Sequence, residues 1–166
     1  MNTSRGSLPF GLLLVAAAVF VMVTSRSLPP VLASHFDAIG KPNGYMPRGI
    51  YVVLMFVIVI VLPSFLAFLP SSLARRGDAR LNIPNREYWL APQKREATVA
   101  YLGQQGKRFA TAVLLFLAYV HWLVVQANTH HPPSLSASWL VGGLTAFLVF
   151  VALWVGSLYA HFRRSA

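Results

Sequence analysis

The sequence contains no cysteine and only four acidic residues among its 166. The absence of cysteine excludes disulfide bonds, thiolate metal sites, iron–sulfur clusters and cysteine nucleophiles. All four acidic side chains, Asp37, Asp78, Glu87 and Glu96, fall in segments that we expect to be loops. The sequence also lacks a carboxylate pair within an apolar segment, a Gly-rich phosphate loop and a Ser-His-Asp arrangement. We therefore expect that the protein is not an enzyme.

Charged residues of both signs are scarce as well. They make up 11% of the chain, whereas soluble domains contain roughly a quarter. Hydrophobic residues make up 56%, the mean hydropathy is +0.59 and the net charge is +10. A nucleic-acid-binding protein would be basic but not this apolar, so we expect no nucleic-acid partner. A membrane protein explains both features, because lipid-facing helices are apolar and Lys and Arg gather in loops.

Four apolar segments, residues 8–24, 50–69, 109–127 and 139–160, contain no Asp, Glu, Lys or Arg. About 20 apolar residues in a helix cross a hydrocarbon core of roughly 30 Å. We therefore expect an all-α membrane protein, in which residues 1–166 form one domain with four transmembrane helices. The first segment could instead be a cleaved signal peptide. Its apolar stretch is long for that role, and Thr24-Ser25-Arg26 is a poor cleavage site, so we expect a retained helix.

Basic residues are distributed unevenly between the two sides that four crossings define. Eleven of the 14 lie in the loop 71–108 or at the two termini, and the other side has Arg26, Lys41 and Arg48. The positive-inside rule places the eleven in the cytoplasm. We therefore expect a membrane protein with both termini in the cytoplasm, and with outer loops at 25–49 and 128–138.

The basic cytoplasmic loop contains a segment that starts at Pro92 and reaches Leu102 with helical character. Tyr88 and Trp89 precede it, and such aromatic side chains gather in the headgroup layer. We expect a short amphipathic helix that lies on the inner leaflet. The alternative is a solvated loop whose charges only fix the topology.

Histidines are the main candidates for chemistry. His121 lies inside the third crossing, seven residues or about 10 Å from Asn128 at helical rise, and intramembrane ionisable residues are by default functional hypotheses. It could equally be a neutral residue that hydrogen-bonds between helices. On the outer side, His35, Asp37, His130 and His131 could bind a metal ion. Their spacing matches no standard ligand pattern, and the alternative is a set of polar loop residues.

Small residues recur at helical spacing in the fourth crossing. Such stripes let helix backbones approach closely, so they mark a packing face inside the monomer or against a partner protein. The residues of this stripe are Gly142, Ala146, Ala152, Gly156 and Ala160.

The first outer loop is rich in Pro and Gly, and we expect an ordered set of turns and neither helix nor strand. Asn43-Gly44 predicts a tight turn with positive φ. The motif Leu28-Pro29, His35-Phe36-Asp37, Gly40 and Pro42-Asn43-Gly44-Tyr45 resembles that of a bacterial membrane domain of unknown function. That domain forms the N-terminal part of the SdpI-type immunity proteins, which protect cells against a secreted killing-factor toxin.

The resemblance covers roughly residues 8–69, and the second half of the chain looks like stand-alone members of that domain family. It implies a non-enzymatic protein of the bacterial cytoplasmic (inner) membrane, of the binding, signalling or immunity type. The ligand or partner would be recognised through the outer loop, at His35, Asp37, Gly40, Gly44 and Tyr45. Two alternatives remain: an accessory subunit of a larger membrane complex, and a small metal- or haem-binding membrane protein that uses the histidines. We expect no other cofactor.

Overall fold

The computed structural model describes residues 8–76 and 82–163. Four ionisable residues named above or counted in the charge distribution lie outside the described residues: Arg5, Asp78, Arg80 and Arg164. The chain forms helix α1 (Leu8–Thr24), the 3-10 turn η1 (Ser25–Ser27), strands β1 (Val31–Phe36) and β2 (Pro42–Pro47), and helices α2 (Arg48–Arg76), α3 (Arg86–Trp89), α4 (Pro92–Ala127) and α5 (Ala137–Arg163).

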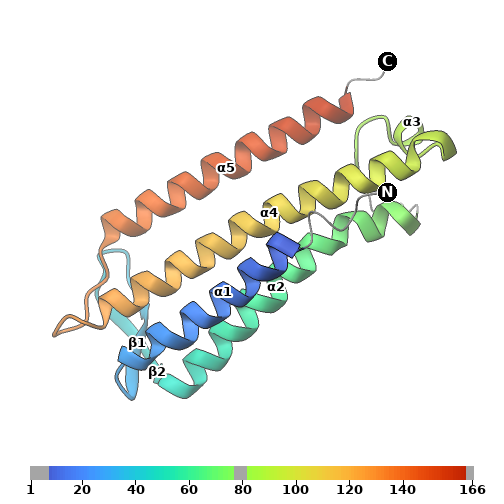
Figure 1. The fold of residues 1–166 in the computed structure, drawn as a ribbon. Helices are drawn as coiled ribbons and strands as arrows, with labels where there is room; N and C mark the ends of the chain where they lie inside the picture. Colours follow the sequence, from blue (N-terminus) through green and yellow to red (C-terminus); the bar gives the residue numbers. More distant parts are fainter. Residues whose placement is uncertain (1–7, 77–81, 164–166) are drawn as a thin grey trace.

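Helices α1, α2, α4 and α5 are long and apolar enough to cross a membrane. The protein is therefore a multi-pass membrane protein, mainly α-helical, as the sequence predicts. α2 has 29 residues and α4 has 36, which correspond to about 43 and 54 Å at helical rise. Both lengths exceed the hydrocarbon thickness of about 30 Å, so both helices extend beyond it. The hairpin of β1 and β2 lies at one end of the bundle, and α3 lies at the other (Figure 1).

The separate amphipathic helix expected between Pro92 and Leu102 is not formed. A helix does begin at Pro92, with proline in its first turn, but it continues without interruption to Ala127 as α4. The glycines that follow Leu102 do not end the helix, because they lie where α4 packs against α2. Gly103 faces Ser71, and a Cβ on Gly106 would lie only 2.8 Å from the Ala67 carbonyl oxygen.

The core lies between α1, α2 and α4. Val21 of α1, Val59 of α2 and Leu114 of α4 belong to one buried cluster, and Leu32 of β1 extends it to the hairpin. Ala67 and Ala110 are almost completely buried where α2 and α4 meet. Small residues therefore allow a close helix–helix approach in this protein, but on α4 and α2.

Helix α5 lies apart from this core, along one side of α4 (Figure 1). Aromatic side chains join the two helices. The rings of Phe116 and Phe147 stack at 4.6 Å between centroids, and those of Phe109 and Trp154 do the same. The hydroxyl of Tyr119 donates a hydrogen bond to the Trp139 carbonyl, and the Tyr119 ring lies against Gly143.

The predicted packing stripe does not pack inside the monomer. Its five residues are all exposed, and a Cβ on Gly142 or Gly156 would meet nothing within 4 Å. The reason is that aromatic rings fill the opposite face of α5 and turn this face away from α4. The other alternative, packing against a partner protein, stays a prediction.

The first outer loop contains an antiparallel hairpin, so the expectation of turns without strands is wrong. β1 and β2 pair from Val31↔Pro47 to Phe36↔Pro42, with irregular register near His35. Asn43 and Gly44 lie within β2 and form no tight turn. The turn is at Asp37–Lys41, and the positive φ of 84° falls on Gly40. Asp37 closes this turn through its backbone and through its carboxylate, which accepts hydrogen bonds from the amides of Ile39 and Lys41.

The opposite end of the bundle is closed by aromatic residues around the end of α5. The Trp89 indole donates a hydrogen bond to the Phe162 carbonyl at 2.9 Å. His161 stacks on Tyr101 with 3.9 Å between ring centroids, and Lys94 lies 3.3 Å above the Tyr88 ring. The aromatic residues that the sequence assigns to the headgroup layer thus also fix the end of α5.

Candidate functional site

The hairpin end of the bundle is stabilised by a polar chain that joins three helices. His121 of α4 is completely buried. Its Nε2 lies 2.7 Å from the Thr24 hydroxyl of α1, and its Nδ1 lies 2.9 Å from the Tyr51 hydroxyl of α2. The Tyr51 ring also stacks on the imidazole, and Phe20 meets it edge to face.

The direction of these hydrogen bonds follows from the Thr24 hydroxyl, which donates its one hydrogen to the Phe20 carbonyl at 2.7 Å. Thr24 must therefore accept from His121, which places the proton on Nε2. Nδ1 then accepts from Tyr51, and every group in the chain is satisfied with a neutral imidazole. The geometry thus supports the second interpretation of His121, a hydrogen-bonding residue between helices.

Asn128 joins the hairpin to the end of α4. Its side-chain oxygen accepts from the Ala33 amide at 2.9 Å, and its side-chain nitrogen donates to the Ala33 carbonyl at 2.9 Å and to the Val124 carbonyl at 2.8 Å. The amide group therefore pairs with β1 as a neighbouring strand would, and it satisfies the two backbone groups of a buried residue.

The second outer loop is attached to the hairpin turn by its backbone. The Leu135 amide donates to the Gly40 carbonyl at 3.0 Å, and the Ser134 amide donates to the Ala127 carbonyl at 3.0 Å. A Cβ on Gly40 would collide with the Leu135 carbonyl oxygen. Glycine is therefore favoured at position 40 for two reasons: its φ is positive, and the Leu135 carbonyl leaves no room for a side chain.

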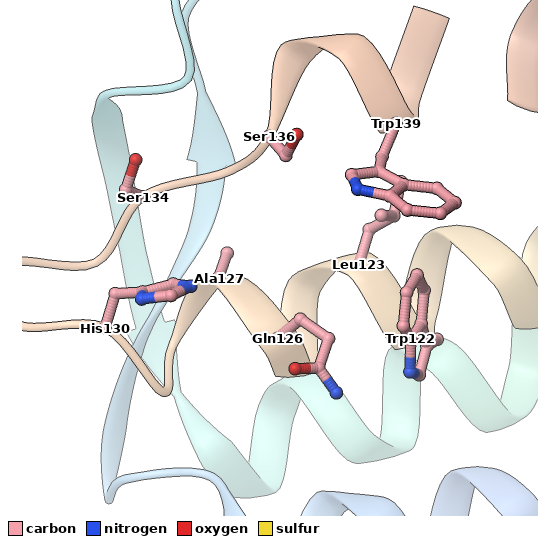
Figure 2. A pocket seen from close by; sticks show the side chains of 8 residues that line it. All are labelled: Trp122, Leu123, Gln126, Ala127, His130, Ser134, Ser136 and Trp139. Carbon is pink, nitrogen blue, oxygen red and sulfur yellow. The ribbon is translucent and has the colours of Figure 1, made fainter. Parts of the chain in front are cut away.

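Between this loop and the helices lies a pocket of about 430 Å³. Figure 2 shows the rings of Trp122 and Trp139 at one side, His130 at the other, and Gln126 between them. The two indoles meet edge to face with 6.2 Å between centroids. The remaining residues that line the pocket come from α4 and from the loop that follows it: Leu123, Ala127, Ser134 and Ser136.

The polar side chains of this pocket are available to a ligand. Within the part of the chain that the structure describes, the side chains of Gln126, His130 and Ser134 have no hydrogen-bond partner. Among the described residues that line the pocket, none is Asp, Glu, Lys or Arg. Indole faces beside free amide, imidazole and hydroxyl groups suit a ligand that is uncharged and partly apolar.

The residues predicted from the outer loop separate into two groups. Asp37 and Gly40 build the turn, and Gly44 lies under the His35 side chain, with a Cβ position 3.1 Å from the His35 Cβ. His35 and Tyr45 are exposed on the hairpin. Nδ1 of His35 lies 3.0 Å from the Ser34 hydroxyl. The hairpin turn does not depend on the side chains of His35 and Tyr45, so these two remain available to contact a ligand.

The four outer residues predicted as metal ligands do not come together. His35, Asp37, His130 and His131 are all exposed, and no group of three His, Cys, Asp or Glu side chains that could hold a metal occurs within residues 8–76 and 82–163. The geometry therefore does not favour a metal site at these histidines.

The sequence does not predict the pocket, although it does single out His130. Its residues come from two helices and a loop, and no fixed spacing connects them. The available signal was the pair Trp122 and Trp139, near the hairpin ends of α4 and α5, which resembles an ordinary interfacial aromatic belt.

Comparison with known proteins gives one family match. Residues 12–61 match a family described as a domain of unknown function (DUF1648). This segment contains most of α1, the whole hairpin and the first half of α2, and it lies within the region 8–69 that carries the sequence resemblance. The chain matches no curated protein and no solved structure.

Proposed function

We propose that this protein is a non-enzymatic receptor in a bacterial inner membrane, of the binding, signalling or immunity type. Its N- and C-termini would be cytoplasmic, and it would bind a ligand at the outer ends of α4 and α5. The hairpin and its turn would support the site, and His35 and Tyr45 would extend it. The resemblance to the immunity proteins agrees with recognition of a secreted molecule on that side.

The orientation has support from the positions of the basic residues. Arg75, Arg76 and Arg95 lie at the end of the bundle that contains α3, whereas Lys41 and Arg48 lie at the hairpin end. Basic residues concentrate on the cytoplasmic side of membrane proteins. The hairpin end would then face outward.

The proposal rests mainly on the pocket at the hairpin ends of α4 and α5. Free polar side chains beside two indole rings, in a cavity of about 430 Å³ without charged residues, are a ready site for an uncharged amphiphilic ligand. The hydrogen bonds that fix Asn128 and Leu135 keep the surrounding backbone in place before a ligand arrives, which lowers the entropy cost of binding.

Site-specific photocrosslinking in living cells tests this proposal. A benzophenone amino acid at Ser136, which lines the pocket, should capture a molecule of small mass after illumination. The same group at Leu148, an exposed position on the apolar surface of α5, is the control and should capture only membrane lipid. Identical products at both positions would contradict a specific outer site.

A second function, the accessory subunit, is favoured by the small-residue face of α5. α5 buries little of its surface, and Gly142 and Gly156 have open space before them. A partner helix could approach closely there. A benzophenone group at Ala152 would then crosslink to another protein, which should also co-purify in fixed stoichiometry. The receptor proposal expects neither result.

A further inference from the structure

A second cavity, of about 460 Å³, lies between α4 and α5 in the half of the bundle remote from the hairpin. One wall consists of Gln105, Arg108 and Thr111 of α4. These residues are three positions apart, so they lie on one face of the helix. The other wall contains Phe150, Leu153, Trp154 and Ser157 of α5, again on one helix face. The cavity is therefore a groove along the helix pair, and it is separate from the outer pocket.

Among the described residues that line the groove, Arg108 alone is charged, through its guanidinium. No carboxylate lines the groove, and within the described residues Arg108 has no hydrogen-bond or ion-pair partner. Gln105, which is 5% exposed, and the hydroxyl of Ser157 lie in the same groove. An unpaired cation beside neutral polar groups is complementary to a phosphate group, which guanidinium binds through two parallel hydrogen bonds.

The rest of the groove is apolar. Phe150 and Leu153 lie farther from the Arg108 end, toward the middle of α5, and Leu153 is 70% exposed. A ligand that places a phosphate on Arg108 would therefore lay a hydrocarbon chain along these side chains.

The depth of the groove in the membrane agrees with this arrangement. Arg108 precedes Asn128 by 20 residues, so it lies about 30 Å along α4 from the outer end. Ser157 follows Trp139 by 18 residues, or about 27 Å along α5. These lengths equal the hydrocarbon thickness of roughly 30 Å. Arg108 and Ser157 therefore lie at the level of the lipid phosphates of the opposite leaflet.

We infer that this groove binds an anionic phospholipid from the leaflet opposite the hairpin, with its phosphate on Arg108 and one acyl chain along Phe150 and Leu153. In the topology proposed above this is the inner leaflet, where basic pockets between transmembrane helices commonly bind anionic headgroups. The bound lipid would fill the open side of the α4–α5 contact.

Competition between two lipids tests the inference. The purified full chain is given equal amounts of phosphatidylglycerol and phosphatidylcholine with the same acyl chains, and native mass spectrometry counts the lipids bound to each protein. The wild type should prefer phosphatidylglycerol. Arg108→Gln should reduce that preference roughly fivefold, which corresponds to about 1 kcal/mol for one basic residue at the membrane surface.

Lys107→Gln is the matched control, because it removes the same charge one residue away but does not line the groove. Its preference should stay at the wild-type value. An equal loss in both variants would show that general electrostatic attraction is responsible, and no loss in Arg108→Gln would equally overturn the inference.

A second variant blocks the groove sterically and leaves its charge unchanged. Ser157→Phe fills the space beside Arg108 from an exposed position on α5, so it should fold and should lose the bound phosphatidylglycerol. Retention of the lipid by this variant would contradict the assigned position. Displacement of the lipid by inorganic phosphate alone would show that the site selects free phosphate and would overturn the lipid assignment.

Discussion

His121 illustrates how a single residue in a membrane acquires a structural role. The imidazole lies between α1, α2 and α4, and each of its two nitrogens has one hydrogen-bond partner, Thr24 and Tyr51. An unsatisfied polar group in this position would be costly, because no water is present to replace the lost partner. The sequence gives the depth of His121 but not the identity of partners that are 97 and 70 residues away.

We predict that His121→Phe and Tyr51→Phe each lower the free energy of unfolding by about 1–3 kcal/mol, because each leaves a buried polar atom without its partner. The double variant should lose less than the sum, with a coupling energy of about 0.6–1.7 kcal/mol. Denaturant titration of the four proteins in detergent measures this cycle. Fully additive losses would show that the two side chains do not interact.

Gly40 and Gly44 provide a matched pair in the hairpin. Gly40→Ala should be the more damaging change, by roughly 1–3 kcal/mol, because a side chain there meets both a left-handed φ and the Leu135 carbonyl. Gly44→Ala places its Cβ 3.1 Å from the His35 Cβ, a tight contact that a small shift relieves, and Gly44 has no positive φ. Thermal unfolding in detergent compares them. A lower melting temperature for Gly44→Ala than for Gly40→Ala would contradict this description of the turn.

At the scale of elements, the closest helix contact is between α4 and α2. Gly103 and Gly106 lie one turn apart on α4, and with Ala110 and Ala67 they allow the two backbones to approach. α5 depends instead on aromatic stacking against α4 and leaves its small residues exposed. Small-residue spacing alone therefore does not identify which helix face is the internal contact.

A glycine-to-valine substitution on α4 and another on α5 distinguish the internal helix contact from the exposed small-residue face. Gly106→Val should destabilise the monomer by roughly 1–3 kcal/mol or more, because the added atoms overlap the α2 backbone. Gly142→Val should leave the melting temperature in detergent near the wild-type value, because nothing lies within 4 Å. If the two variants had the same melting temperature, the assigned contact between α4 and α2 would be wrong.

The elements differ in how far the sequence determines them. The four spans were predictable, because apolar length alone selects them. The hairpin was not, since its strands are short, β2 has proline at both ends, and β1 is fixed by Asn128 from 95 residues away. The continuity of α4 was missed because two glycines normally weaken a helix, and their contact with α2 is visible only in three dimensions. For the same reason the pocket could not be predicted.

At the scale of the whole molecule, the two ends of the bundle differ in chemistry. The hairpin end contains the uncharged pocket, and the other end contains α3, the aromatic cluster and Arg108. This difference between the two ends agrees with the proposal of a protein that binds a ligand at one membrane face and is anchored by charge at the other.

Single-cysteine labelling tests the orientation, because the chain has no native cysteine. Ile39→Cys lies on the exposed hairpin turn and Glu96→Cys on the far end of α4. An impermeant maleimide applied to intact cells should label the first and not the second, and both should react after lysis. Labelling of Glu96→Cys in intact cells would reverse the proposed topology.

A preformed outer site for an uncharged ligand should retain that ligand when the protein is purified. Native mass spectrometry of the wild type, extracted from its own membrane in mild detergent, should show one small uncharged molecule per chain. Gln126→Leu and Trp139→Ala should lose it, whereas Leu144→Ala, on the exposed surface of α5, and Arg108→Gln should keep it. If the wild type carried no bound molecule, or if the two pocket variants retained the molecule as well as the wild type does, the proposed outer site would be wrong.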